Sequence, residues 1–231
     1  TRDGGESWKN VTQKSLKKGG RVDSVEPSKH EQSTAFVTVL RYQLGDWSPY
    51  IYKTTNYGET WKLITNGIPS DFPVRVVRED PNKKGLLYAG TEFGIFISRN
   101  GGDNWESFQQ NLPITPITDL KVHREDIVLS TMGRSFWILD RINFLHHYYK
   151  VDEPYLVKPF ETFRYRYRAS RNSNNFYPQS SVVLDYYLES DEYENINLSF
   201  YDKDNNLINS FSNSSGEDIT DTSYNMELSQ Y

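Results

Sequence analysis

Two acidic and two basic residues near the ends of predicted strands are candidates for hydrolytic chemistry. Cleavage of a glycosidic bond needs two carboxylates that flank the bond, and the planar guanidinium group of arginine can hold a sugar carboxylate. Glu92 is the first candidate because it follows a β-rich run and precedes Gly94, so that its side chain projects from a turn. The other candidates are Asp140, Arg75 and Arg134. The competing interpretation of each is a hydrogen-bonded loop side chain, and we commit to none of them as catalytic.

Other kinds of chemistry have little support in the sequence. The 231 residues contain no cysteine, which excludes disulfides, thiolate metal sites and cysteine nucleophiles. His146 and His147 are adjacent, but the sequence places no acidic or histidine partner at metal-ligand spacing from them. The sequence also has no phosphate-binding loop, dinucleotide fingerprint or Ser-His-Asp order. We therefore predict no metal site and no cofactor.

Three similar octets recur along the chain and identify the elements that must position any site. Each has Ser or Thr first, Asp or Asn third, Gly fifth and Trp eighth. These positions are Thr1, Asp3, Gly5 and Trp8; Thr54, Asn56, Gly58 and Trp61; and Ser98, Asn100, Gly102 and Trp105. Asp and Asn accept hydrogen bonds from the amides that follow them, and Gly supplies a positive φ. We therefore interpret the octets as structural hairpin turns whose Trp and leading hydroxyl pack against the sheet that they connect.

The segments around the octets repeat in the same order. An apolar run ends at an acidic residue and Pro, two β-rich runs follow, and a short run begins at the octet Trp. Four short strands per repeat of about 45 residues are typical of a β-propeller blade. We predict two whole blades near residues 22–66 and 74–110, and a third over 117–140 that lacks an octet. Residues 1–12 are expected to supply the last turn and strand of a preceding blade.

The predicted fold is all-β, with about three four-stranded blades in residues 1–141, a linker over 142–160 and the start of an immunoglobulin-like β-sandwich over 161–231. Aromatic residues make up 15% of the chain and only three residues are alanine, which favours strands over helices. In the last segment, strands are predicted at Phe163–Arg168, Val182–Glu189, Ile196–Asp202 and Leu207–Ser212. Propellers close with roughly four to eight blades. The missing blades of a longer parent chain are therefore the first expected partners.

Charge and hydropathy limit the remaining partners. The formal net charge is −5, and the residues from 171 onward are strongly acidic. Neither half of the chain has the basic face that nucleic-acid binding requires. The longest apolar runs are about four residues, far short of a membrane span. We predict no nucleic-acid partner and no membrane-spanning segment.

The octets resemble the Asp-box, or BNR repeat, of sialidases and related propellers. The longer stretches are similar to a bacterial family of sortilin-like BNR-repeat propeller proteins that are often labelled glycosyl hydrolases; these stretches are Pro49–Trp61, Val74–Pro81, Gly85–Ile97 and Thr131–Asp140. Met132 stands where the family pattern has His. Because every strong motif in the sequence is a turn or packing motif, we favour a non-catalytic scaffold or binding module for a glycan or peptide. The resemblance implies a periplasmic, outer-surface or secreted protein. The alternative that it implies is a fragment of a sialidase-like or endoglucanase-like glycoside hydrolase.

Overall fold

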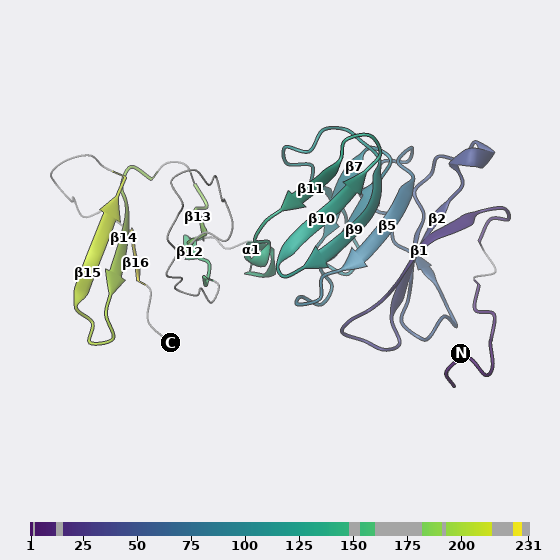
Figure 1. The fold of residues 1–231 in the computed structure, drawn as a ribbon, viewed down its shortest axis with the longest axis horizontal. Coiled ribbons are helices and arrows are strands. Elements are labelled where there is room, and N and C mark those ends of the chain that lie inside the picture. The colour runs from purple at the N-terminus through teal and green to yellow at the C-terminus, as the bar shows by residue number, and fades with distance from the viewer. Residues whose placement is uncertain are drawn as a thin grey trace, which may run out of the picture. The chain divides into compact units, whose positions relative to one another are not determined.

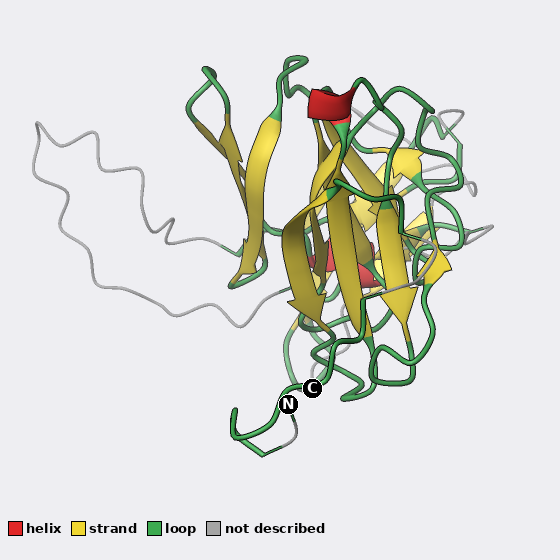
Figure 2. Ribbon diagram, turned by 90° about the vertical axis from the view of Figure 1, so that its right-hand side faces the viewer, coloured by secondary structure: helices red, strands yellow, loops and turns green. Residues whose placement is uncertain are grey.

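The chain divides into two compact units, Thr1–Ile142 and Asn143–Tyr231. The computed structural model describes residues 1, 3–12, 16–147, 153–159, 182–190, 193–213 and 224–227. Sheets make up most of the regular structure (Figure 1). The helices within the described residues are the short 3₁₀ turn η1 (Tyr42–Leu44) and α1 (Asn143–His147), drawn in red in Figure 2. The predicted all-β class is confirmed.

The first unit contains three antiparallel sheets whose strands follow the order of the chain. The first sheet joins β1 (Arg21–Pro27), β2 (Ala35–Leu40), β3 (Ile51–Thr54) and β4 (Lys62–Leu63). The second joins β5 (Val74–Glu79), β6 (Leu87–Thr91), β7 (Gly94–Ser98) and β8 (Glu106–Ser107). The third joins β9 (Ile117–His123), β10 (Asp126–Thr131) and β11 (Phe136–Leu139). This up-and-down order is that of propeller blades.

The first strand of each sheet carries an irregularity at the same place. The register skips Asp23 in β1, Arg75 in β5 and Thr118 in β9. A β-bulge of this kind adds one residue and re-aims a side chain. The shared register also defines equivalent positions, which are Val22, Val74 and Ile117 in one set and Val25, Val77 and Leu120 in another.

The main core lies between the first and second sheets. Phe36 and Ile51 come from the first sheet, Val77 and Leu87 come from the second, and Trp105 from the third octet completes the cluster. These side chains are at most 2% exposed. Strand β5 packs against β1 and β2, and β9 packs against β5 and β6. Consecutive sheets are therefore held face to face by apolar burial, the main favourable contribution to folding.

The second unit contains two small sheets. Strand β12 (Tyr155–Leu156) pairs with β13 (Tyr186–Tyr187), while β14 (Ile196–Tyr201) pairs antiparallel with β15 (Leu207–Ser212) and parallel with β16 (Tyr224–Glu227). The predicted strands at Ile196–Asp202 and Leu207–Ser212 match β14 and β15. The strand predicted at Val182–Glu189 is shortened to β13. The strand predicted at Phe163–Arg168 lies outside the described residues, and the immunoglobulin-like sandwich stays a prediction.

The segment predicted as a linker has regular structure of its own. Helix α1 begins at Asn143, directly after the first unit, and β12 follows within the same segment. Leu145 is 4% exposed, so the helix buries an apolar side chain. Asn143 donates from Nδ2 to the Lys158 carbonyl at 3.4 Å. These contacts order a segment whose sequence shows no strong periodic signal.

Candidate functional site

The three octets form the same hydrogen-bonded turn. The leading hydroxyl donates to the Asp or Asn side chain at 2.8, 3.0 and 2.9 Å. The same hydroxyl accepts the Gly N–H at 2.8, 2.9 and 2.9 Å. The Asp or Asn oxygen then accepts the N–H of the seventh octet residue at 3.0, 2.9 and 2.9 Å. These bonds engage, inside the turn, the polar groups that a ligand would otherwise contact.

The octet tryptophans join consecutive repeats. Trp61 donates from Nε1 to the Val11 carbonyl at 2.9 Å, and Trp105 donates to the Ile64 carbonyl at 2.8 Å. Val11 and Ile64 each lie three residues after the Trp of their own octet. The sequence predicts that these rings pack on the sheet that they connect. The structure shows in addition that each ring reaches the preceding repeat, a contact that the spacing within one octet does not reveal.

Arg75 and Glu92, two of the candidate residues, meet in the second sheet. Nη2 of Arg75 lies 2.6 Å from Oε1 of Glu92, and each side chain is only 12% exposed. Arg75 is the extra residue of the β5 bulge, and Glu92 lies in the two-residue turn between β6 and β7. The ionic contact lacks hydrogen-bond alignment, and Nε of Arg75 has no hydrogen-bond partner within the described residues. The pair is thus buried, and Nε of Arg75 and Oε1 of Glu92 are polar atoms without a hydrogen-bond partner among the described residues.

The turn that carries Glu92 is fixed by its neighbours. Thr91 donates from Oγ1 to the Gly94 carbonyl at 2.9 Å and accepts the Phe93 N–H at 3.0 Å. The Glu92 N–H donates to the Pro73 carbonyl at 3.0 Å, which ties the turn to the segment before β5. Gly94 has a φ of 139°, and a Cβ there would lie 1.9 Å from a Gln109 side-chain atom. Glycine is therefore required at this turn.

Four aromatic side chains, Tyr42, Trp47, Phe72 and Phe93, gather around this pair and are called the aromatic platform below. Trp47 and Phe93 stack with ring centres 6.4 Å apart at 26°, and Phe72 lies 4.7 Å from Phe93. Tyr42 lies 6.0 Å from Trp47, and the guanidinium carbon of Arg75 lies 5.7 Å from the Tyr42 ring centre. Trp47 is 47% exposed and the other three rings are half-buried.

Sequence reasoning missed the aromatic platform because its members come from three separate connections between strands. The sequence feature that could have indicated the platform is the pair of aromatic residues, Tyr42 and Trp47, in the connection between β2 and β3. Aromatic rings with one apolar face and a polar neighbour are typical of binding surfaces. The arrangement can therefore stack against a flat or apolar ligand group beside an ion pair.

Asp46 holds the loop that carries Tyr42 and Trp47. It accepts hydrogen bonds from Nε of Arg41 at 2.9 Å, from the Tyr50 hydroxyl at 2.8 Å and from the Ser48 N–H at 3.2 Å. Burial acts to raise the pKa of Asp46, but the hydrogen bonds from Tyr50, Arg41 and Ser48 outweigh it and hold this pKa well below its usual range. The carboxylate is therefore ionised at neutral pH, and it fixes one side of the aromatic platform.

Arg78 connects the first strands of all three sheets. From β5 it contacts Asp119 of β9 at 2.8 Å and Glu26 of β1 at 3.5 Å. It also donates to Oγ of Ser24 at 3.0 Å and to the Leu120 carbonyl at 3.0 Å. Burial raises the pKa of Glu26, and the nearby Arg78 opposes this shift without cancelling it. Arg78 thus links the sheets, and these bonds engage its guanidinium group.

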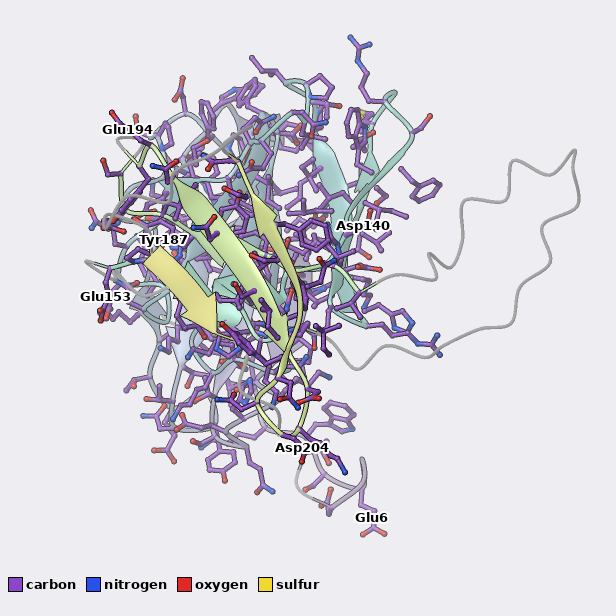
Figure 3. All side chains as sticks on the ribbon, turned by 90° about the vertical axis from the view of Figure 1, so that its left-hand side faces the viewer. Glu6, Asp140, Glu153, Tyr187, Glu194 and Asp204 are labelled. Carbon is purple, nitrogen blue, oxygen red and sulfur yellow. The ribbon has the colours of Figure 1, made fainter. Side chains whose placement is uncertain are left out.

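The other two candidates lie on the third sheet. Arg134 is exposed in the turn before β11, and its carbonyl accepts Nε1 of Trp137 at 2.8 Å. Asp140 is exposed directly after β11 and is labelled in Figure 3. The structure therefore brings together Arg75 and Glu92 but places Arg134 and Asp140 on a different sheet.

The described residues, which include His146 and His147, contain no group of three or more His, Asp or Glu side chains that could hold a metal ion. None of the described helices combines the length and the apolar character needed to cross a membrane.

Comparisons with known proteins give weak matches. No protein-family model and no curated protein matches the sequence. Among solved structures, YCF48 bound to a D1 peptide matches with 19% identity and a TM-score of 0.46, over 61% of this chain and 44% of that chain. An ancestral GH74 enzyme matches with 22% identity and a TM-score of 0.41, over 50% of this chain and 14% of that chain. The GH74 xyloglucanase from Xanthomonas campestris matches with 15% identity and a TM-score of 0.42, over 57% of this chain and 22% of that chain.

In each of these matches the chain spans less than half of the solved structure. Similarity at this level does not extend to function. The description of the sheets as propeller blades rests on their strand order, shared register and octet turns.

Proposed function

We propose that this chain is a non-catalytic binding module built from propeller blades, and that it binds its ligand at the aromatic platform. The observation that carries the proposal is the burial of Glu92 and its ion pair with Arg75. Its carboxylate is 12% exposed and lies against Arg75, whereas a glycosidase carboxylate must reach the scissile bond. The octets, the other strong motif, have their polar groups engaged within turns.

The chemistry of the platform suits a glycan or a peptide. The rings of Trp47 and Phe93 offer apolar faces that can stack on a sugar ring or on an apolar side chain. Beside them, Nε of Arg75 is a buried donor without a hydrogen-bond partner in the described part of the chain.

The alternative is a fragment of a glycoside hydrolase. It requires a second carboxylate about 5–10 Å from Glu92 across a bound sugar. The charged contact that the structure gives Glu92 is with an arginine. The assignment to exported BNR-repeat proteins, and with it a periplasmic, outer-surface or secreted location, rests on the sequence resemblance of the octets and of the longer stretches around them. We propose it together with the binding function.

A binding screen with matched variants tests the proposal. Residues 1–231 are applied to an oligosaccharide array and to a library of short peptides, and release of reducing ends is followed for every oligosaccharide bound. We expect binding without hydrolysis, and a loss of affinity of at least about tenfold in Trp47→Ala, as for an aromatic anchor residue. Trp8→Ala is the matched control because Trp8 is 80% exposed and lies outside the platform.

Two results would contradict the proposal. Hydrolysis that is abolished in Glu92→Gln would establish the enzyme instead. Binding that is equally strong in wild type and Trp47→Ala would remove the ligand from the platform.

A further inference from the structure

Exposed apolar side chains continue from the aromatic platform onto the third sheet. Ile114 and Met132 are 77% and 57% exposed. Ile114 lies in the connection between β8 and β9, and Met132 lies in the turn between β10 and β11. One repeat earlier, the corresponding connection and turn carry Phe72 and Phe93 of the aromatic platform. We call Ile114, Met132 and the aromatic platform together the apolar row.

Backbone hydrogen bonds show that the two turns occupy equivalent places. The Met132 N–H donates to the Pro116 carbonyl at 2.9 Å, directly before β9. In the second sheet, the Glu92 N–H donates in the same way to the Pro73 carbonyl at 3.0 Å, directly before β5. Met132 therefore stands in the third sheet where Glu92 stands in the second. The third sheet has an exposed apolar side chain at the position where the second sheet has a buried carboxylate.

Side-chain hydrogen bonds connect the parts of the apolar row that lie on the second and third sheets. Gln109 accepts the Ile95 N–H at 3.3 Å, just after the turn that carries the platform residue of this sheet. The same amide donates to the carbonyls of the two residues before Ile114 at 2.8 and 3.1 Å. Thr115 then donates from Oγ1 to the Met132 carbonyl at 3.3 Å. The exposed side chains of the row are thus held beside one another along one end of the sheets.

The chemistry of the row on the third sheet favours a polypeptide over a glycan. Residues 108–116 include no charged side chain. The side-chain amide of Gln109 and the hydroxyl of Thr115 are both engaged by the chain itself. A sugar ring buried on this surface would leave hydroxyl groups without partners, which is costly. Isoleucine and the flexible methionine instead pack well against the apolar side chains of a peptide.

The length and the charge of the row define the peptide further. Packed sheets lie about 10 Å apart, so the row from the first to the third sheet spans about 20 Å, the length of about six extended residues. Arg134 is exposed two residues after Met132, in the same turn. Its guanidinium group can bind a carboxylate through two parallel hydrogen bonds. An acidic side chain of the peptide would therefore complement this end of the row.

We propose that the apolar row binds an extended polypeptide segment of about six residues. One apolar side chain of the segment lies on the aromatic platform, a second lies on Ile114 and Met132, and an acidic side chain pairs with Arg134. This inference rests on the proposed function and narrows its ligand from a glycan or peptide to an acidic, apolar peptide.

Fluorescence anisotropy with synthetic peptides tests the inference on residues 1–231. The full-length probe is an end-blocked peptide of about eight residues with Phe near one end and Leu next to Glu near the other, made in both sequence orders. One matched probe has Gln in place of Glu, and a half-length probe keeps only the Phe end. We expect the full-length probe to bind about tenfold more tightly than either matched probe, because each of these lacks one set of contacts.

Matched variants of the chain assign these contacts. Ile114→Ser and Met132→Ser should weaken the full-length probe about tenfold and leave the half-length probe unchanged. Arg134→Gln should abolish the preference for Glu over Gln. Ile138→Ser is the apolar control, because Ile138 is 59% exposed within β11 and outside the turn. Arg124→Gln is the charge control, because Arg124 is exposed in the turn between β9 and β10, at the opposite end of the sheet. Neither control should change the affinity.

Four results would overturn the inference. If Trp47→Ala weakens binding and the Ile114 and Met132 variants do not, the ligand stays on the platform, and the proposed function survives without the extension. If Trp47→Ala has no effect either, the proposed function itself fails. Equal losses in Ile138→Ser and Met132→Ser would reduce the row to general apolar adhesion. Binding of an oligosaccharide that is lost in Met132→Ser, without binding of any peptide, would assign the row to a glycan.

Discussion

The first and second sheets place valines at equivalent positions, yet only the second buries them. Val77 is 0% exposed and its equivalent Val25 is 61% exposed. The register around the two residues is the same, including the bulge that precedes them. The difference shows that burial in this fold comes from the neighbouring sheet and not from the sequence of the sheet itself.

The burial of the octet tryptophans also depends on the neighbouring repeat. Trp105 is 2% exposed and bonded to the preceding repeat, whereas Trp8 is 80% exposed. Both belong to turns with the same internal hydrogen bonds. The turn is therefore a local property of the octet, and the stability that its Trp contributes depends on the repeat before it.

The largest difference in stability is expected between removal of the buried Trp105 and removal of the exposed Trp8. Trp105→Ala empties a core position and should lower the free energy of unfolding by about 3–5 kcal/mol. Trp8→Ala removes an exposed ring and should change it by less than about 0.5 kcal/mol. Urea unfolding followed by circular dichroism measures both. Similar losses in the two variants would show that Trp8 is already packed as Trp105 is.

A smaller effect should follow from breaking the link between the three first strands. Arg78→Met leaves Glu26 buried without its cation, and we expect a loss of about 3 kcal/mol in the free energy of unfolding. The control is Lys62→Met. The Lys62 and Asp103 side chains of its ion pair are 71% and 64% exposed, so its loss should destabilise the protein far less. If Arg78→Met costs no more than the control, the sheets are held by apolar contacts alone.

The smallest expected effect is on the pH dependence of the free energy of unfolding. Glu26 in β1 and Asp46 in the loop between β2 and β3 should change it in opposite directions. The pKa of Glu26 is raised in the folded protein, so the folded state keeps this proton to higher pH than the unfolded state. Its contribution to the free energy of unfolding therefore falls as pH rises above the ordinary Glu value of 4.5. The pKa of Asp46 is lowered, so its contribution is present above the ordinary Asp value of 3.8 and is lost as pH falls below it.

Unfolding curves between pH 3 and 7 for wild type, Glu26→Gln and Asp46→Asn separate these contributions. Relative to wild type, Glu26→Gln should remove a downward slope with pH, and Asp46→Asn should remove an upward one. Slopes of the same sign would mean that burial does not dominate at Glu26.

Much of the first unit follows from the sequence because the octets repeat. The turn residues, the four-strand order and the missing octet of the third sheet can be located from spacing and residue type, since turns and alternation are local properties. The contact of Trp105 with Ile64 could not be found this way because it joins two repeats. The bulge at Arg75 was not predicted. Val76 and Val77 interrupt the alternation of the strand, but the sequence does not indicate which residue is left unpaired.

The candidate site was only partly predictable. Glu92 and Arg75 stand out as charged residues beside strand ends, but their ion pair depends on which strands are neighbours. The aromatic platform combines residues from three connections, and its rings meet only after the first two sheets pack. In the second unit, the parallel pairing of β14 with β16 joins distant segments that carry no shared motif.

We infer that the first strand of each sheet in this repeat is stabilised by burial against the preceding sheet. Urea unfolding of the matched pair Val77→Ala and Val25→Ala in residues 1–231 tests it most directly. We expect a loss of about 1.5–3 kcal/mol for Val77→Ala, because the substitution deletes two buried methyl groups and leaves a cavity, and a loss of less than about 0.5 kcal/mol for Val25→Ala. Equal losses at the two positions would contradict it.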